Sequence, residues 1–315
     1  MHRSGEEYIC IGGCSAAWSD IDPDKSGNER STGINGFVGE IAKVTILPDA
    51  VSAAEARAMA QAENMDDNND PILDLVIDDK GNVSNGSIYG PAISSTDISG
   101  TEKVVDAENK NITFNGNQGS SSDYKFPTKN IAADLADGFS FELMFKVTSD
   151  KAYWTNGYMG VLDYEQLGGF GLMVKDEGTS GNGYINIFFE IAFNDTSVER
   201  GYNWKSITFA NAKISTDEEE YWYHCVGSYD AKTGTVSFYV NGTFVGSVEM
   251  PTGFHDTTFY DTDPYISIGA CAGEVKDTKS QDSIYGFDGS ISVCRIYSKP
   301  VTAEQAAEMY QKATA

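Results

Sequence analysis

The feature that most constrains the fold is a long series of short segments that have the pattern of β-strands and are separated by turn residues. Residues 139–147 alternate with the two-residue period of a half-buried strand. Asn241-Gly242, the strongest hairpin dipeptide in the chain, joins residues 235–240 to residues 243–249. Residues 230–234 form a second predicted hairpin loop, which ends in a glycine where a left-handed residue is needed.

Further apolar segments extend this series over the chain after residue 70. They cover residues 72–77, 111–114, 169–174, 184–193 and 222–229. A helix follows at the end, because Thr302 and Gln305 form a capping box and the helical pattern runs to about Gln311. More than ten strands with one terminal helix predict an all-β fold, a two-sheet antiparallel β-sandwich.

The end of the chain is repeated near its start, where each copy reads as strand, polar loop, strand and short helix. The matching segments are 8–14 with 265–271, 36–41 with 286–291, and 51–55 with 301–305. An acidic, Asn-rich stretch at 64–70 has the composition of a linker. We therefore predict a partial module over residues 1–63, this linker, and a complete domain over residues 71–315.

The partial module would supply two strands and a helix without the sheets that they normally complete. Unpaired strand edges associate with other strands. Two arrangements remain open: the segment packs on the complete domain of the same chain, or it exchanges between chains in a swapped dimer.

Composition narrows the partners. The formal net charge of −25 repels nucleic-acid phosphates and anionic membrane surfaces, so no nucleic-acid partner is expected. No apolar run reaches about 18 residues, so no membrane insertion is expected either. The five cysteines and three histidines have no zinc spacing, and we interpret most of the cysteines as small buried hydrophobic residues.

Four segments taken in order carry a family resemblance. They are Trp222–Asp230, Gly234–Gly242, Ile266–Gly269 and Phe287–Tyr297. Their order resembles that of the laminin-G-like, concanavalin A-like jelly-roll domains of bacterial surface and secreted proteins, over residues 71–312 as a complete domain. The resemblance implies an extracellular or cell-surface location. Because no segment reads as a signal peptide, we expect the chain to be a fragment of a longer secreted protein.

A search for catalytic motifs gives no complete one, so we predict that the chain is not an enzyme. Glucanases of this superfamily carry a Glu-x-Asp-x-(x)-Glu run on one strand, and Asp163-Tyr164-Glu165 lacks its first glutamate. Glu142 and Glu190 each stand alone among apolar residues. A divergent glycosidase would need two carboxylates from different strands, about 5–10 Å apart in a groove.

Glycan binding needs exposed aromatic rings that stack on sugars, together with polar groups that hold hydroxyls. We place Tyr153, Trp154 and Tyr158 on one loop, Tyr202 and Trp204 on another, and His255 on a third. The alternative interpretation is that these aromatic residues cap the edge of the sandwich.

Calcium is the expected cofactor, in a structural role, because members of the superfamily often hold one such ion at a sheet edge. Asp256, Asp261, Asp263 and Asp288 supply the hard oxygen ligands that this ion prefers. The sequence has no EF-hand spacing, so the ligand set stays open.

The sequence therefore predicts a non-catalytic extracellular binding or adhesion module, with carbohydrate as the expected ligand and a glycan or a cell-surface protein as the partner. Two alternatives stand beside it. The first is a structural or protein-interaction spacer attached to a hydrolase, a phosphoesterase or glycosidase, encoded elsewhere in the parent protein. The second is the divergent glycosidase.

Overall fold

The computed structural model describes residues 70–87, 90–97, 102–116, 122–128, 135–148, 158–164, 168–175, 183–256, 264–271 and 285–315. All of them belong to one compact unit, Ser52–Ala315. The partial module at 1–63, most of the predicted linker and the exchanged dimer lie outside the described residues and stay predictions.

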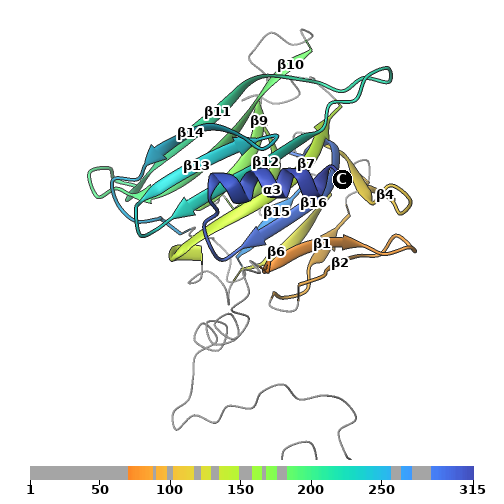
Figure 1. Ribbon diagram of the computed structural model, residues 1–315. Helices are drawn as coiled ribbons and strands as arrows, with labels where there is room; N and C mark the ends of the chain where they lie inside the picture. Colours follow the sequence, from red (N-terminus) through yellow and green to blue (C-terminus); the bar gives the residue numbers. More distant parts are fainter. Residues whose placement is uncertain are drawn as a thin grey trace, which may run out of the picture. The chain divides into compact units, whose positions relative to one another are not determined.

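Strands of the described residues form two antiparallel sheets, as predicted (Figure 1). The nine-stranded sheet has the order β14 (Thr243–Glu249), β13 (Thr235–Val240), β12 (Tyr223–Asp230), β7 (Gly138–Val147), β16 (Asp288–Tyr297), β1 (Leu73–Ile77) and β2 (Val83–Asn85), with β5 (Asn111–Asn115) paired to β16 and β4 (Val104–Asp106) paired to β5. The seven-stranded sheet has the order β11 (Tyr202–Lys213), β10 (Tyr184–Asn194), β9 (Phe170–Lys175), β8 (Tyr158–Asp163), β15 (Tyr265–Ile268), β6 (Asp123–Pro127) and β3 (Ser94–Thr96).

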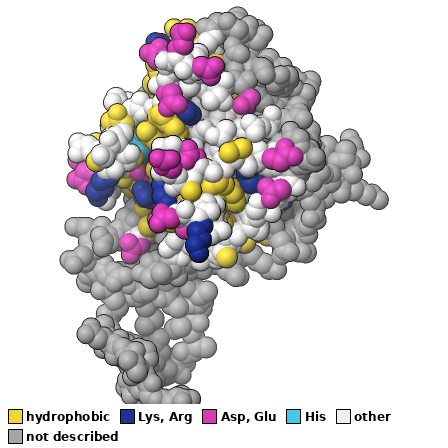
Figure 2. Space-filling model, turned by 90° about the vertical axis from the view of Figure 1, so that its right-hand side faces the viewer, with side chains coloured by type: hydrophobic (Ala, Val, Ile, Leu, Met, Phe, Trp, Pro, Cys, Tyr) yellow, Lys and Arg dark blue, Asp and Glu magenta, His cyan; other side chains and the backbone are white. Residues whose placement is uncertain are grey.

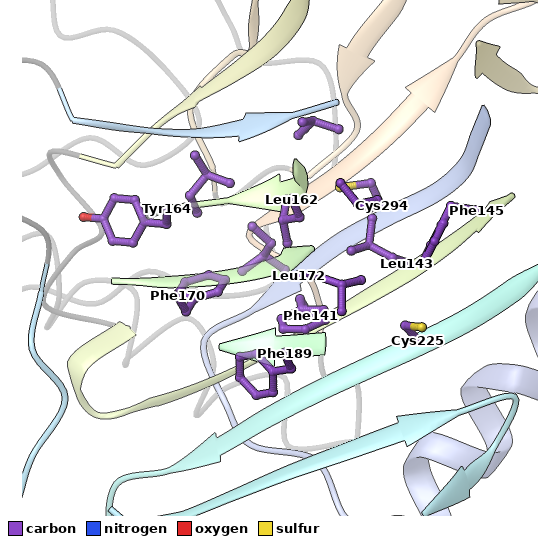
Figure 3. Close-up of a cluster of buried hydrophobic side chains, with 14 of the residues drawn as sticks. Phe141, Leu143, Phe145, Leu162, Tyr164, Phe170, Leu172, Phe189, Cys225 and Cys294 are labelled. Carbon is purple, nitrogen blue, oxygen red and sulfur yellow. The ribbon is translucent and has the colours of Figure 1, made fainter. Parts of the chain in front are cut away.

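The core lies between the two sheets and is built from every second residue of their central strands. On β7, Phe139, Phe141, Leu143, Phe145 and Val147 are fully buried, as the alternation predicts. Aromatic rings from both sheets meet there: Phe139 stacks on Phe170 of β9 at 4.3 Å between ring centroids. Figure 3 shows labelled side chains of β7, β8, β9 and β10 converging in this layer.

The predicted turns and helix are confirmed. Asn241 and Gly242 both have positive φ, 50° and 69°, which is the geometry of the tight hairpin that this dipeptide favours. The α-helix α3 (Ala303–Ala313) begins with the predicted capping box, in which Thr302 and Gln305 bond to each other's backbone N–H. It ends two residues beyond the expected position.

Helix α3 covers the outer face of the nine-stranded sheet. Val226 of β12 and Tyr239 of β13 pack there against Val301 and Ala306. Ser228 of β12 holds the segment before the helix on the sheet, because its hydroxyl accepts a hydrogen bond from the Val301 N–H at 2.9 Å. Since a helix covers one face and the core the other, β7 is buried on both faces over most of its length.

A polar network lies on this covered face, and it corrects the interpretation of Glu142 as an isolated residue. Oε1 of Glu142 lies 2.9 Å from Nε2 of the fully buried His224. Its Oε2 accepts hydrogen bonds from Tyr297 at 2.9 Å and from Arg295 at 3.2 Å. Arg295 also donates to Asp74 at 2.8 Å, so the network ties β1, β7, β12 and β16 together.

Three described cysteines fit the predicted role. Cys225, Cys271 and Cys294 are buried, and the first and last face the core from β12 and β16. Within the described part of the chain, no helix combines the length and apolar composition needed to cross a bilayer.

Phe141 provides a test of the core. Its ring makes an edge-to-face contact with Phe189 at 5.0 Å and lies where a Cβ on Gly227 would clash. We expect Phe141→Ala to lower the free energy of unfolding by about 3–5 kcal/mol, measured by urea denaturation. The control is Phe244→Ala on β14, where the side chain is 53% exposed and the expected change is below about 0.5 kcal/mol. Equal losses in the two variants would contradict this account of the core.

We expect the ionisation of Glu142 to make the free energy of unfolding fall in acid. Burial raises the pKa of this carboxyl, but its hydrogen bonds with His224 and Tyr297 and the neighbouring positive charges, that of Arg295 first, hold the pKa below its usual value. A carboxyl with a lowered folded pKa stabilises the fold above its unfolded pKa, and that contribution is lost as the pH falls through the folded pKa. Urea unfolding of the wild type and Glu142→Gln between pH 7 and pH 3 measures this effect.

At neutral pH we expect the Glu142→Gln variant to be less stable by about 3 kcal/mol, because it leaves buried partners without their carboxylate. The difference should shrink as the pH drops below the unfolded value of 4.5. A difference that stays constant down to pH 3 would show that the ionised carboxylate is not what stabilises this face.

Candidate ligand-binding site

The candidate site is built where β10 ends and β11 begins, at one end of the seven-stranded sheet. Strand β10 ends at Asn194, and the connecting turn is fixed by Asp195, whose Oδ1 accepts hydrogen bonds from the backbone and hydroxyl of Ser197. These hydrogen bonds hold the pKa of Asp195 below its usual value. Gly201 closes the turn with a φ of 78° and sends the chain back as β11.

Three aromatic side chains meet at this turn, and we call them the aromatic cluster: Tyr202, Trp204 and His255. The His255 ring stacks on Tyr202, with centroids 4.8 Å apart and planes 16° from parallel. Tyr202 in turn makes an edge contact with Trp204 at 5.7 Å and 89°. All three side chains are partly exposed, which leaves aromatic surface available to a ligand.

His255 is held rigidly although it lies outside any strand. Its backbone N–H donates to Ala192 and its carbonyl accepts from Gly169, so β9 and β10 both anchor it. The Asn194 amide donates to the carbonyls of Gly253 and Phe254, and its Oδ1 therefore accepts from His255 Nδ1 at 2.8 Å.

This hydrogen bond fixes the tautomer of His255. Burial lowers the pKa of the ring despite the opposing charge of Asp256, so the ring is neutral at pH 7. With the proton on Nδ1, Nε2 is left as an acceptor. Among the described residues, no hydrogen bond reaches Nε2.

Arg200 also contacts Tyr202. Its guanidinium lies 5.1 Å from the Tyr202 ring centroid and donates to the Tyr202 carbonyl and to Asn203 Oδ1, both at 2.8 Å. The planar donors of arginine suit such simultaneous stacking and hydrogen bonding. The cluster is therefore set before any ligand arrives.

The structure brings together Tyr202, Trp204 and His255 of the predicted binding residues. It corrects their placement, because Tyr202 and Trp204 lie on strand β11 and not on a loop. Tyr158 is also misplaced in the prediction: it begins strand β8, where it contacts Phe188 and Lys175 away from the cluster. Tyr153 and Trp154 lie outside the described residues.

Sequence reasoning missed Asn194, Arg200 and Asn203 as members of the site. The signal that could have identified them is the polar turn Asn194–Gly201 between two strand patterns, which brings both strand ends beside each other.

Of the four aspartates predicted to bind calcium, the structure describes two. Asp256 directly follows His255 and lies beside Gly168, whereas Asp288 begins β16 in the other sheet and accepts a hydrogen bond from Thr148 at 3.1 Å. Asp261 and Asp263 lie outside the described residues. Within the described ranges, no three His, Cys, Asp or Glu side chains come together as a metal site.

The comparisons with known proteins agree with this architecture. A family model described as the concanavalin A-like lectin/glucanases superfamily matches residues 117–307, more than half of the chain. The chain belongs to this family. The resemblance predicted from the sequence is thereby confirmed over residues 117–307, and the concanavalin A-like sandwich is the fold. No curated protein sequence matches the chain.

Solved structures with this fold include receptor-binding domains of botulinum neurotoxins. The type G domain is 15% identical, with a TM-score of 0.51, over 78% of this chain and 51% of its own. The binding domain of neurotoxin DC in complex with SialylT is 13% identical, with a TM-score of 0.52, over 77% and 51%. The same domain in complex with rat synaptotagmin II is 12% identical, with a TM-score of 0.52, over 77% of this chain and 52% of its own. The concanavalin A-like chain thus spans about half the length of these structures, and at such identities the likeness concerns the fold.

Proposed function

We propose that this concanavalin A-like domain is a non-catalytic extracellular binding module that recognises carbohydrate through the aromatic cluster. The observation that carries the proposal is the meeting of Tyr202, Trp204 and His255 in one braced, partly exposed group. Aromatic faces stack on the C–H faces of sugars, and adjacent amides and the free His255 nitrogen can hold hydroxyls.

The related folds support a binding role in general terms. The same neurotoxin binding domain was solved with SialylT and with rat synaptotagmin II, so proteins that contain this fold include ones that bind other molecules. For the present chain we propose a cell-surface glycan as the partner. Recognition of a protein is the alternative, and competition by free sugar separates the two.

The glycosidase alternative needs two accessible carboxylates. Glu190 and Asp163 share a register row on the outer face of the seven-stranded sheet, with Gly171 of β9 between them. Two strand spacings put their Cα atoms about 10 Å apart. Asp163 is only 1% exposed, however, and this favours a role for the site in binding.

Trp204→Ala tests the proposed function. A panel of neutral and acidic polysaccharides is screened first, and the affinity of the best one is then measured by calorimetry. We expect the variant to lose about tenfold in affinity, because one ring-on-sugar contact contributes about 1–1.5 kcal/mol. The matched control is Trp222→Ala, a half-buried tryptophan paired with Lys146 outside the cluster, which should bind within about twofold of the wild type.

Failure of the wild type to bind any polysaccharide, or equal losses in the two tryptophan variants, would refute carbohydrate recognition by the cluster. The same samples are followed by chromatography for shortened products. Release of such products would refute the non-catalytic assignment.

We also propose that Asp256, Asp261 and Asp263 help to hold a structural calcium ion. A ligand that binds only the folded state raises the melting temperature. Calcium should therefore raise the melting temperature of the wild type, EDTA should reverse the rise, and Asp261→Asn with Asp263→Asn should abolish it. An equal response to magnesium, or none to calcium, would count against the site.

A further inference from the structure

Glu190 lies in the middle of β10 and points away from the core. Its neighbours along the strand, Phe189 and Ile191, are fully buried in the core, so alternation places Glu190 on the outer face. Figure 2 shows one face of the molecule, on which acidic side chains lie between hydrophobic ones.

The sheet register connects Glu190 to the aromatic cluster. Glu190 pairs with Ser206 of β11, and Ala192, two residues further along β10, pairs with Trp204. Trp204 and Glu190 are therefore diagonal neighbours on one face, about 7–8 Å apart and within reach of long side chains. On the other side Glu190 pairs with Gly171, which has no side chain to cover it.

Glu190 is a half-buried carboxylate without a partner. Among the described residues, no hydrogen bond and no ion pair reaches its oxygens. Burial raises its pKa, and the more distant charge of Arg200 offsets this only in part. Arg200 is itself engaged by Tyr202 and Asn203. Glu142 shows what a carboxylate with a structural role looks like in this fold: three side chains hydrogen-bond to it.

The chemistry of this surface selects the ligand. An ionised carboxylate and the free nitrogen of a neutral His255 only accept hydrogen bonds, so they require a ligand rich in donors, such as sugar hydroxyls. Three acidic side chains of this region, Asp195, Glu199 and Asp256, outnumber Arg200, so a carboxylated sugar would meet a net negative potential.

We propose that Glu190 is the specificity-determining residue of the glycan site, where it accepts hydroxyl hydrogen bonds from a neutral sugar seated beside Trp204 and excludes sugars that carry a carboxylate. This inference rests on the proposed function and names its ligand class. It assigns Glu190 a role in recognition and none in holding the fold together.

The experiment compares Glu190→Gln with the wild type of the full chain. The neutral probes are oligosaccharides of glucose, mannose and galactose. The acidic probe is oligogalacturonate, the carboxylated counterpart of the galactose oligosaccharide. We expect the wild type to bind a neutral probe and reject oligogalacturonate. In the variant, affinity for that neutral probe should fall about tenfold, because a charge-assisted hydrogen bond becomes a neutral one. The ratio of the affinity for the neutral probe to the affinity for oligogalacturonate should fall by at least the same factor.

The control is Glu249→Gln, an exposed glutamate of β14 in the other sheet, which should leave both affinities unchanged. Thermal unfolding is the second readout. Because removal of an unpaired, half-buried charge relieves a desolvation cost, the melting temperature of Glu190→Gln should stay the same or rise. A clear fall would overturn the inference, because it would give Glu190 a structural role.

The outcomes separate the two proposals. If Trp204→Ala abolishes binding but Glu190→Gln changes neither affinity nor discrimination, the inference about Glu190 is wrong and the glycan site stands. A wild type that prefers oligogalacturonate also overturns the inference alone. If no probe or screened polysaccharide binds the wild type, the proposed function fails, and the inference fails with it.

Discussion

The structure depends on the burial of alternate side chains between two sheets. A strand has only two faces, so each central residue either enters the shared core or faces outward. On β7 and β10 every inward residue is apolar and buried, and the aromatic contact between Phe141 and Phe189 joins the two strands across the core. Once this layer is fixed, the outward positions of the same strands are free to take other roles.

The two sheets use this freedom differently, and one carboxylate on each shows how. Glu142 faces outward from β7, but helix α3 covers that face, and His224, Arg295 and Tyr297 satisfy the charge. Glu190 faces outward from β10, and the described residues leave it unpaired. A half-buried charge without a partner lowers stability, so its presence beside an aromatic cluster is more readily explained by recognition than by folding.

The internal repeat is explained by the same division between inward and outward positions. Over residues 36–61 and 286–311 the two copies align without a gap, because matching residues differ by 250 in number. Identical residues occupy seven positions that are buried in the second copy: Gly286, Phe287, Gly289, Ile291, Ile296, Val301 and Ala306. The outward network is not repeated, since Thr45 and Leu47 stand where the second copy has Arg295 and Tyr297. The repeated pattern is therefore that of the buried positions, both in the core and under helix α3.

How much the sequence predicts follows from how local each signal is. The hairpin at Asn241-Gly242 and the alternation of β7 are local, and both were predicted correctly. Strand β11 was missed because an edge strand needs few apolar residues, and its polar residues, such as Asn203, Lys205 and Ser206, are also typical of a loop. The partners of Glu142 lie 82 to 155 residues away, so only the fold reveals the network.

The site itself combines both kinds of information. Its residue types could be chosen from the sequence, because partly exposed aromatic residues beside polar turns are what a sugar site requires. Its geometry could not, because the stack of His255 on Tyr202 joins segments 53 residues apart through the backbone hydrogen bonds of β9 and β10. The core therefore does more than stabilise the sandwich: by fixing the register of β9, β10 and β11, it sets the distance between Trp204 and Glu190, and with it the size of ligand that can touch both.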